Sequence, residues 1–123
     1  MNMSYDDGFL IAIKKKNLKA YKAMAALGCK IWREHGALDY KECTGDDLKV
    51  PEGCGNSYLD LLKCKKDETV IFAFIVYKSR AARDKINAKV MNDPRMAAAM
   101  QGKKMPFDLK RMWVGGFAGL VEC

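Results

Sequence analysis

The sequence contains little of what several protein classes require. It has one histidine, three prolines and five cysteines that form no CxxC pair. Its longest uninterrupted apolar run, residues 70–77, has 8 residues, whereas a membrane span needs roughly 20. The amino terminus has neither the basic flank nor the apolar stretch of a signal peptide. We therefore expect no membrane span and a cytoplasmic location, where an odd number of scattered cysteines stays reduced.

Metal and cofactor motifs are also missing. One histidine, together with cysteines that lack short ligand-like spacings, gives no pattern for a metal site. The pair Gly115-Gly116 lacks the GxGxxG spacing of a dinucleotide site and fits a bulge or a close backbone approach within a strand. We expect no metal and no cofactor.

The composition is that of a globular protein with surplus positive charge. Of 123 residues, 50% are hydrophobic and 30% are charged, and the formal net charge is +7. This length fits one domain, residues 1–123. The surplus lies after residue 62 and is divided among a turn, a helix and the approach to the last strand, which indicates a dispersed surface property rather than one binding groove.

The apolar pattern predicts five strands. Residues 69–77 show no alternation of polar and apolar positions, so both faces of that strand are expected to be buried. A short hairpin turn, 65–68, leads into it. The other strands are expected at 5–14, which is apolar on both faces, and at 37–44, 58–64 and 110–121.

Two helices and one short helical turn are predicted between these strands. Apolar residues recur at helical spacing over 17–35, with Asn17 as a candidate N-cap and Gly36 as the stop. A second helix begins after Ser79 and ends at Asp93-Pro94. Residues 95–101 are expected to add a short helical turn.

This order, β-α-β-β-β-α-β, predicts an α+β ferredoxin-like sandwich, in which an antiparallel sheet carries one extra strand and two helices on one face. Strands 5–14 and 69–77 would then leave apolar side chains on the uncovered face, a larger patch than soluble monomers usually expose. A twofold partner laid over that face would cover it and give a homodimer. The alternative is that loops 44–56 and 98–110 cover it within one chain.

Several strings in the chain make a specific resemblance. They run nearly from end to end and include Asp7-Gly8-Phe9, His35-Gly36-Ala37-Leu38, Asp93-Pro94-Arg95-Met96, Met105-Pro106-Phe107-Asp108, Lys110-Arg111-Met112 and Gly115-Gly116-Phe117. On these motifs the chain resembles the DUF1428 family of small, uncharacterised bacterial proteins. The resemblance implies the dimeric α/β barrel superfamily, which includes cofactor-free monooxygenases, haem-degrading enzymes and lactone isomerases with a cavity between sheet and helices. Phe74 and Trp113 depart from the family pattern, which would alter packing or the shape of the pocket.

His35 and Asp108 are the candidate catalytic residues. The only histidine of a chain is the obvious general acid or base near neutral pH, and Asp108 is a second group that could move a proton. The structural alternative for His35 is a favourable contact between its imidazole and the carbonyl groups at the end of its helix.

The candidate ligand-binding residues lie mainly on the second helix and after it. An arginine beside apolar helix positions needs a carboxylate partner, which either a bound anionic small molecule or the protein itself supplies. A structural ion pair is the alternative to ligand binding at these positions. The candidates are Trp32, Arg83, Asp84, Asn87 and Arg95.

Three functions follow from these features. The first is a homodimer with a small-molecule pocket between sheet and helices, of the cofactor-independent monooxygenase or isomerase type. The second is a non-catalytic small-molecule-binding or stress-associated protein that uses the same pocket. The third is an RNA-binding module, which the chain disfavours because it lacks a K/R-G-F/Y motif and because a dimer would hide the sheet face.

Overall fold

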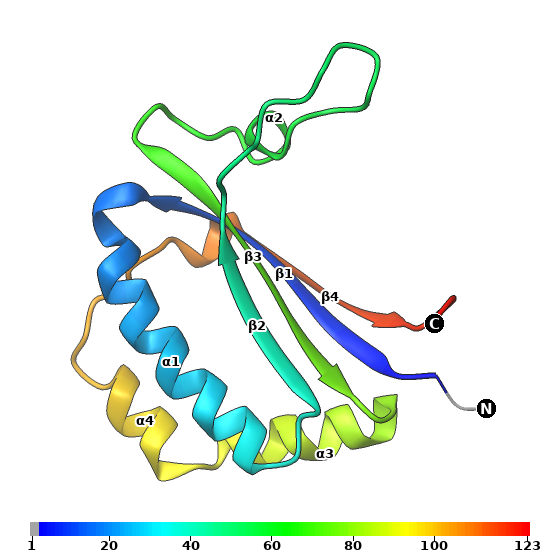
Figure 1. The fold of residues 1–123 in the computed structure, drawn as a ribbon. Helices are drawn as coiled ribbons and strands as arrows, with labels where there is room; N and C mark the ends of the chain where they lie inside the picture. Colours follow the sequence, from blue (N-terminus) through cyan, green and yellow to red (C-terminus); the bar gives the residue numbers. More distant parts are fainter. Residues whose placement is uncertain (1–2) are drawn as a thin grey trace.

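A four-stranded antiparallel sheet with helices on one face makes up the part of the chain described by the computed structural model, residues 3–123 (Figure 1). Helices α1, α3 and α4 lie on one side of the sheet, and both termini lie at the end opposite α2. The elements in chain order are β1 (Tyr5–Lys14), η1 (Lys15–Asn17), α1 (Leu18–Glu34), β2 (Asp39–Thr44), α2 (Tyr58–Leu61), β3 (Glu68–Tyr77), α3 (Arg80–Met91), α4 (Pro94–Met100), η2 (Leu109–Arg111) and β4 (Met112–Ala118).

The strand order is that of a ferredoxin-like sheet. The strands lie in the order β2-β3-β1-β4, and each neighbouring pair is antiparallel. Helix α1 connects β1 to β2, and α3 with α4 connects β3 to β4. The two strands joined by each helical connection therefore run parallel to one another, although they are not neighbours in the sheet. The predicted α+β class and ferredoxin-like arrangement are confirmed.

The extra strand predicted at 58–64 is wrong. Residues 58–61 form the helical turn α2, which begins where the Ser57 hydroxyl accepts a hydrogen bond of 3.1 Å from the Leu59 amide. Leu59 and Leu62, three positions apart, pack with Ala12 and Val70 at one end of the sheet. Their spacing is helical, so this segment covers the sheet instead of pairing with a strand.

The other element bounds depend on capping groups. Gly36, with φ of +116°, follows α1 as predicted, and the Ser79 hydroxyl caps α3 by accepting from the Ala82 amide at 3.1 Å. Asn17 stands at the N-cap position of α1 without capping it, because its side-chain amide donates to the Pro106 carbonyl at 3.0 Å. The last strand is shorter than 110–121, since Asp108 starts the η2 turn by accepting from the Lys110 amide.

The two faces of the sheet are covered very differently. On the helix face, the apolar residues of β1 and β3 pack against α1 and α3 in a continuous core. On the other face, Val70 is buried by Leu62, but Phe72, Trp113 and Phe117 are about half exposed or more. The expectation that both faces of 69–77 are buried therefore fails at Phe72 within one chain.

The loops leave most of this open face uncovered. The connection from β2 to β3 reaches only the end of the sheet near Ala12 and Val70. The segment after α4 lies on the helix side, where Phe107 packs edge-on against Tyr21 with ring centroids 5.7 Å apart. Intrachain loops thus cover one end of the face and leave its centre open.

Candidate functional site

A small cavity lies between the helices and the sheet. Its volume is about 180 Å³. Trp32 and Phe107 contribute aromatic surface to its wall, and the methionines that line it are Met24, Met96, Met100, Met105 and Met112. Methionine side chains are flexible and polarisable, so this wall can adapt to an apolar ligand.

Glu42 is the acidic group of this cavity. Alternation along β2 directs Tyr40 and Glu42 to the helix face, opposite Ile75 and Ala73 of β3. The Tyr21 hydroxyl, on α1, donates to one carboxylate oxygen of Glu42, and the Tyr40 hydroxyl donates to the other. The site therefore consists of one carboxylate held between two phenols.

Gly28 makes room for this arrangement. A Cβ atom at position 28 would lie 3.2 Å from the Tyr40 hydroxyl oxygen, which is tighter than ordinary contact. A helix interior normally favours alanine over glycine, so the absence of a side chain here lets α1 approach Tyr40 closely.

Burial keeps both phenols neutral. It raises the pKa values of Tyr21 and Tyr40 well above the usual value of 10.0, and the hydrogen bonds to Glu42 raise them further. Both tyrosines thus remain hydrogen-bond donors over the physiological range. They fix the Glu42 carboxylate in place and can relay a proton to or from it.

A groove on the outside of the molecule reaches the same residues. It lies between α1 and β2, has a volume of about 500 Å³, and includes Cys29 and Cys43 in its lining. Tyr21, Tyr40 and Glu42 line both this groove and the inner cavity. The carboxylate accordingly stands in the wall between solvent and cavity, where a ligand could approach it.

Most of the predicted ligand-binding residues come together in a second polar network. The Arg83 guanidinium lies 2.6 Å from the buried Asp7 carboxylate and 2.8 Å from Asp84. The side-chain oxygen of Asn87 accepts from the Tyr77 hydroxyl at 3.1 Å and from the Trp32 indole at 3.0 Å. Its side-chain amide donates to Asp7 at 3.4 Å. These groups satisfy one another, and the Arg83 guanidinium is occupied by the protein's own carboxylates.

His35 and Arg95 belong to a separate cluster. His35 Nε2 lies 2.9 Å from Asp93 Oδ2, and the guanidinium of Arg95 contacts Asp93 at 2.9 Å and Glu34 at 2.7 Å. Arg95 and then His35 hold the pKa of Asp93 well below its usual range. The cluster joins the end of α1 to the start of α4.

The two predicted catalytic residues lie at opposite ends of α1. His35 is the C-cap residue of this helix, and Asp108 lines a groove beside Lys16 and Asn17 at its start. A helix of 17 residues is about 25 Å long at 1.5 Å per residue. Within one chain, therefore, His35 and Asp108 do not reach the same atom.

The sequence alone does not identify Glu42, Tyr21 and Tyr40 as a site. The available signal was a Tyr-x-Glu pair on the mixed strand at 37–44, which directs a carboxylate to the same face as a tyrosine. Nothing in the sequence shows that Tyr21 on a helix completes the set.

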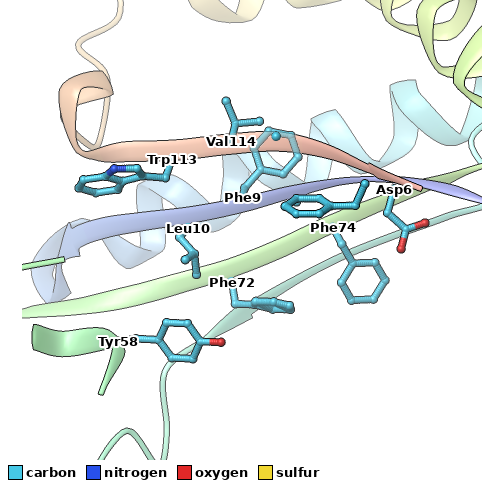
Figure 2. A pocket seen from close by; sticks show the side chains of 11 residues that line it. Asp6, Phe9, Leu10, Tyr58, Phe72, Phe74, Trp113 and Val114 are labelled. Atoms are coloured by element: carbon cyan, nitrogen blue, oxygen red, sulfur yellow. The ribbon is translucent and has the colours of Figure 1, made fainter. Parts of the chain in front are cut away.

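The open face of the sheet forms a second, larger depression. Figure 2 shows Leu10, Phe72 and Trp113 on three adjacent strands, with Tyr58 at one end. The depression has a volume of about 550 Å³. Within residues 3–123 the buried Oδ1 atom of Asp6, another residue of its lining, has no hydrogen-bond partner. Burial, followed by repulsion from Glu122 and Asp7, raises the pKa of Asp6.

Residues 3–123 contain neither a candidate metal site nor a candidate membrane span. No group of three or more histidine, cysteine, aspartate or glutamate residues in this part of the chain could hold a metal ion. None of its helices is both long enough and apolar enough to cross a membrane.

Comparison with known proteins gives a family and a fold. Residues 4–109 match the model of a family described as "Protein of unknown function (DUF1428)". The chain is 40% identical over 120 residues to the uncharacterized protein YbaA of Escherichia coli K12, covering 98% of this chain and 99% of YbaA, and it matches YbaA of Shigella flexneri equally well.

Two solved structures share the fold at low sequence identity. A nipsnap family protein of unknown function from Agrobacterium tumefaciens superposes with a TM-score of 0.59 at 15% identity, covering 96% of this chain and 89% of that one. A dimeric ferredoxin-like protein from an uncultured marine organism superposes with a TM-score of 0.51 at 12% identity, covering 98% and 99%.

Proposed function

The chain belongs to the DUF1428 family of proteins of unknown function, and we propose that it is a homodimer in which each subunit binds a small, mainly apolar molecule between sheet and helices and transfers a proton through Glu42. The observation that carries this proposal is the Glu42 carboxylate, held by Tyr21 and Tyr40 in the wall of a methionine-lined cavity. It favours a cofactor-independent enzyme of the isomerase or monooxygenase type.

Both reaction types begin with removal of a proton from the ligand. In an isomerisation, Glu42 takes a proton from one atom of the substrate and returns it to another, so no oxidant is needed. In an oxygenation, the deprotonated substrate supplies the electrons to O₂; one oxygen atom enters the product as a carbonyl and the other leaves as water. A carboxylate base beside an apolar cavity suits either reaction.

The roles derived from the sequence stay predictions beside this proposal. These are proton transfer by His35 and Asp108, and ligand binding by Trp32, Arg83, Asp84, Asn87 and Arg95. Glu42 is the better candidate for proton transfer because it lines the cavity, whereas His35 is paired with Asp93. Trp32 is the one ligand-binding candidate that lines the cavity itself.

A deuterium-exchange experiment tests the role of Glu42. A panel of small quinols, enones and unsaturated lactones is incubated with the protein in D₂O, and solvent deuterium entering each compound is followed by NMR. Removal of a positioned base typically costs about 10²–10⁴-fold, so Glu42→Gln should lose exchange by that factor while circular dichroism stays unchanged. Glu52→Gln is the matched control, because this carboxylate is exposed and lies outside the cavity. Equal exchange in wild type and Glu42→Gln would contradict the proposal.

The dimer is proposed through the open face of the sheet, with residues 1–123 as one domain of a dimeric α/β barrel. Support comes from the exposed Phe72, Trp113 and Phe117, which with their neighbours form an apolar patch of the kind that marks an interface. A protein with a similar fold is described as a dimeric ferredoxin-like protein.

Sedimentation at micromolar concentration tests this assembly. Wild type is expected at twice the chain mass of 13.8 kDa, and Phe72→Glu is expected to sediment as a monomer because it adds a charge to the proposed interface. Met91→Glu, at an exposed position of α3, is the control and should remain dimeric. A wild-type species of one-chain mass would contradict the proposal.

Non-catalytic binding in the same cavity is the second candidate. It is favoured by the fact that both Glu42 oxygens already accept hydrogen bonds from the protein. In that case a compound that binds in the cavity would show no deuterium exchange, and Glu42→Gln would bind it as wild type does.

RNA binding is the third candidate. Exposed aromatic residues on a sheet face are the feature that RNA-recognition modules use, and Phe72, Trp113 and Phe117 provide it. Among residues 3–123, the lining of this depression includes Asp6 but no lysine or arginine, which weighs against contact with phosphates. Fluorescence anisotropy with a single-stranded oligonucleotide distinguishes the candidates, since we expect no salt-sensitive binding.

A further inference from the structure

A further depression, at the opposite end of α1 from His35, is lined by several basic residues. It has a volume of about 650 Å³ and is lined by residues from β1, η1, the start of α1, the turn before β3 and the segment after α4. We call it the lysine groove. Its basic residues, which converge from four separate segments, are Lys14, Lys16, Lys65, Lys104 and Arg111.

Internal carboxylates neutralise only part of this charge. Glu68 is buried and pairs with Arg111, whose guanidinium also donates to the carbonyl of Leu62 at 3.1 Å. Asp108 is the second acidic residue of the groove, and its side chain accepts from the Lys110 amide at 2.9 Å. Among residues 3–123, none of the four groove lysines forms an ion pair with an aspartate or glutamate. Four ammonium groups therefore face one unpaired carboxylate.

The adjoining helix end adds to the positive potential. The first turn of α1 contains no acidic residue, although the start of a helix favours negative charge. Lysine side chains near that position are repelled by the positive end of the helix dipole, and a bound anion would reduce this repulsion. The groove lysines supply most of the positive potential, and the helix end adds to it.

The lysine groove and the inner cavity share part of their walls. Met105 and Phe107 line both of them. The ring of Phe107 packs edge-on against Tyr21, and the Tyr21 hydroxyl donates to Glu42. A molecule with its charged end on the lysines could thus extend along Phe107 and Met105 toward the Glu42 carboxylate, and its own negative charge would stay away from Glu42.

We propose that the lysine groove binds the carboxylate or phosphate of an amphiphilic small molecule whose apolar part occupies the methionine-lined cavity. The proposal rests on the proposed function for the identity of the cavity and adds the chemical class of its ligand. Part of the lysine surplus, which is dispersed along the sequence, therefore lies together in one groove of the folded chain.

Trp32 can report on ligand entry, because it lines the cavity and the only other tryptophan is Trp113. In a Trp113→Phe background, octanoate, 1-octanol and inorganic phosphate are titrated at low and at physiological salt. Octanoate carries both an anion and an apolar chain, octanol has the chain alone, and phosphate has the charge alone. We expect octanoate to change the Trp32 fluorescence and to bind more tightly than octanol, with an affinity that salt weakens.

Two triple variants of equal charge provide the decisive comparison. Lys14→Gln, Lys16→Gln and Lys104→Gln together remove three groove charges and should weaken octanoate on the order of tenfold. The control combines Lys78→Gln, Lys85→Gln and Lys89→Gln, which are exposed and lie outside the groove, and it should bind octanoate as wild type does.

The outcomes separate this proposal from the proposed function. Equal binding of octanoate and octanol, or equal effects of the two triple variants, would overturn the anion site while leaving the apolar cavity intact. Phosphate binding, or recruitment to vesicles of anionic phospholipid, without any octanoate response at Trp32 would overturn the amphiphilic ligand. Octanoate binding is measured on protein with an unchanged Glu42 and needs no turnover, so equal deuterium exchange in wild type and Glu42→Gln would contradict the proposed function and leave the anion site standing.

Discussion

Replacement of Asp7 by asparagine should destabilise the protein far more than the same replacement at Asp84. Both carboxylates contact the Arg83 guanidinium, at 2.6 Å and 2.8 Å. They differ in burial, since the side chain of Asp7 is 7% exposed and that of Asp84 is 62% exposed. The pair of variants therefore compares a buried and a solvated partner of one arginine.

The expected magnitude follows from the charge left behind. Loss of one partner of a buried ion pair costs about 3–5 kcal/mol, whereas an exposed pair contributes about 0–1 kcal/mol. Arg83 retains Asp84 and lies 4.9 Å from the centroid of the Tyr5 ring, so we expect Asp7→Asn to fall at the lower end, about 3 kcal/mol.

Urea unfolding at fixed protein concentration measures both variants. With a slope of about 2 kcal/mol/M, a loss of about 3 kcal/mol lowers the midpoint by about 1.5 M. Adding Arg83→Met to Asp7→Asn should recover part of the loss, because it removes the uncompensated charge. If Asp7→Asn and Asp84→Asn lie within about 0.5 kcal/mol of each other, burial does not control this network and the reasoning is refuted.

Three further predictions concern packing and charge. Leu62→Ala, at a residue 1% exposed, should cost about 2–4 kcal/mol, while Leu61→Ala, at a residue 64% exposed, should stay within about 0.5 kcal/mol of wild type in the same urea assay. Gly28→Ala should lack the increase of about 1 kcal/mol in the free energy of unfolding that is usual in a helix interior, because its Cβ would crowd the Tyr40 hydroxyl. An increase of that full size, measured by calorimetry, would show that the Cβ atom is accommodated without crowding. For Asp6, burial raises the pKa above 3.8, so the folded state binds the proton more tightly and stability falls as pH rises from 3.8 through the raised value. Asp6→Asn should remove that fall in urea unfolding between pH 3 and 7, and an unchanged pH profile would contradict it.

The arginines and the groove lysines differ in their partners within the protein. Arg83 and Arg95 each have two carboxylate contacts from the protein, so a ligand that used them would have to displace an internal partner. The lysines near the start of α1 have no such partners among residues 3–123. An anionic ligand would therefore compete with fewer carboxylates of the protein at Lys14, Lys16 and Lys104 than at the arginines.

Local patterns were sufficient for most of the secondary structure. The strand predicted at 5–14 has the bounds of β1, and the helix predicted at 17–35 differs from α1 by one residue at each end. The failure at 58–64 has a local cause, because Leu59 and Leu61 alternate as in a short strand, whereas Leu59 and Leu62 have helical spacing. The Ser57 hydroxyl, which accepts from the Leu59 amide, is the local signal for the helical turn.

What the sequence determined by itself was the α+β order of most elements and the apolar character of β1 and β3 on both faces, because both follow from periodicity along single segments. Tertiary structure alone decided which polar groups meet. Tyr21 and Glu42 are 21 positions apart, and Asp7 and Arg83 are 76 apart. Their contacts exist only after α1 and α3 dock on the sheet, because docking buries Asp7, partly buries Glu42 and leaves guanidinium and hydroxyl groups as their nearest donors.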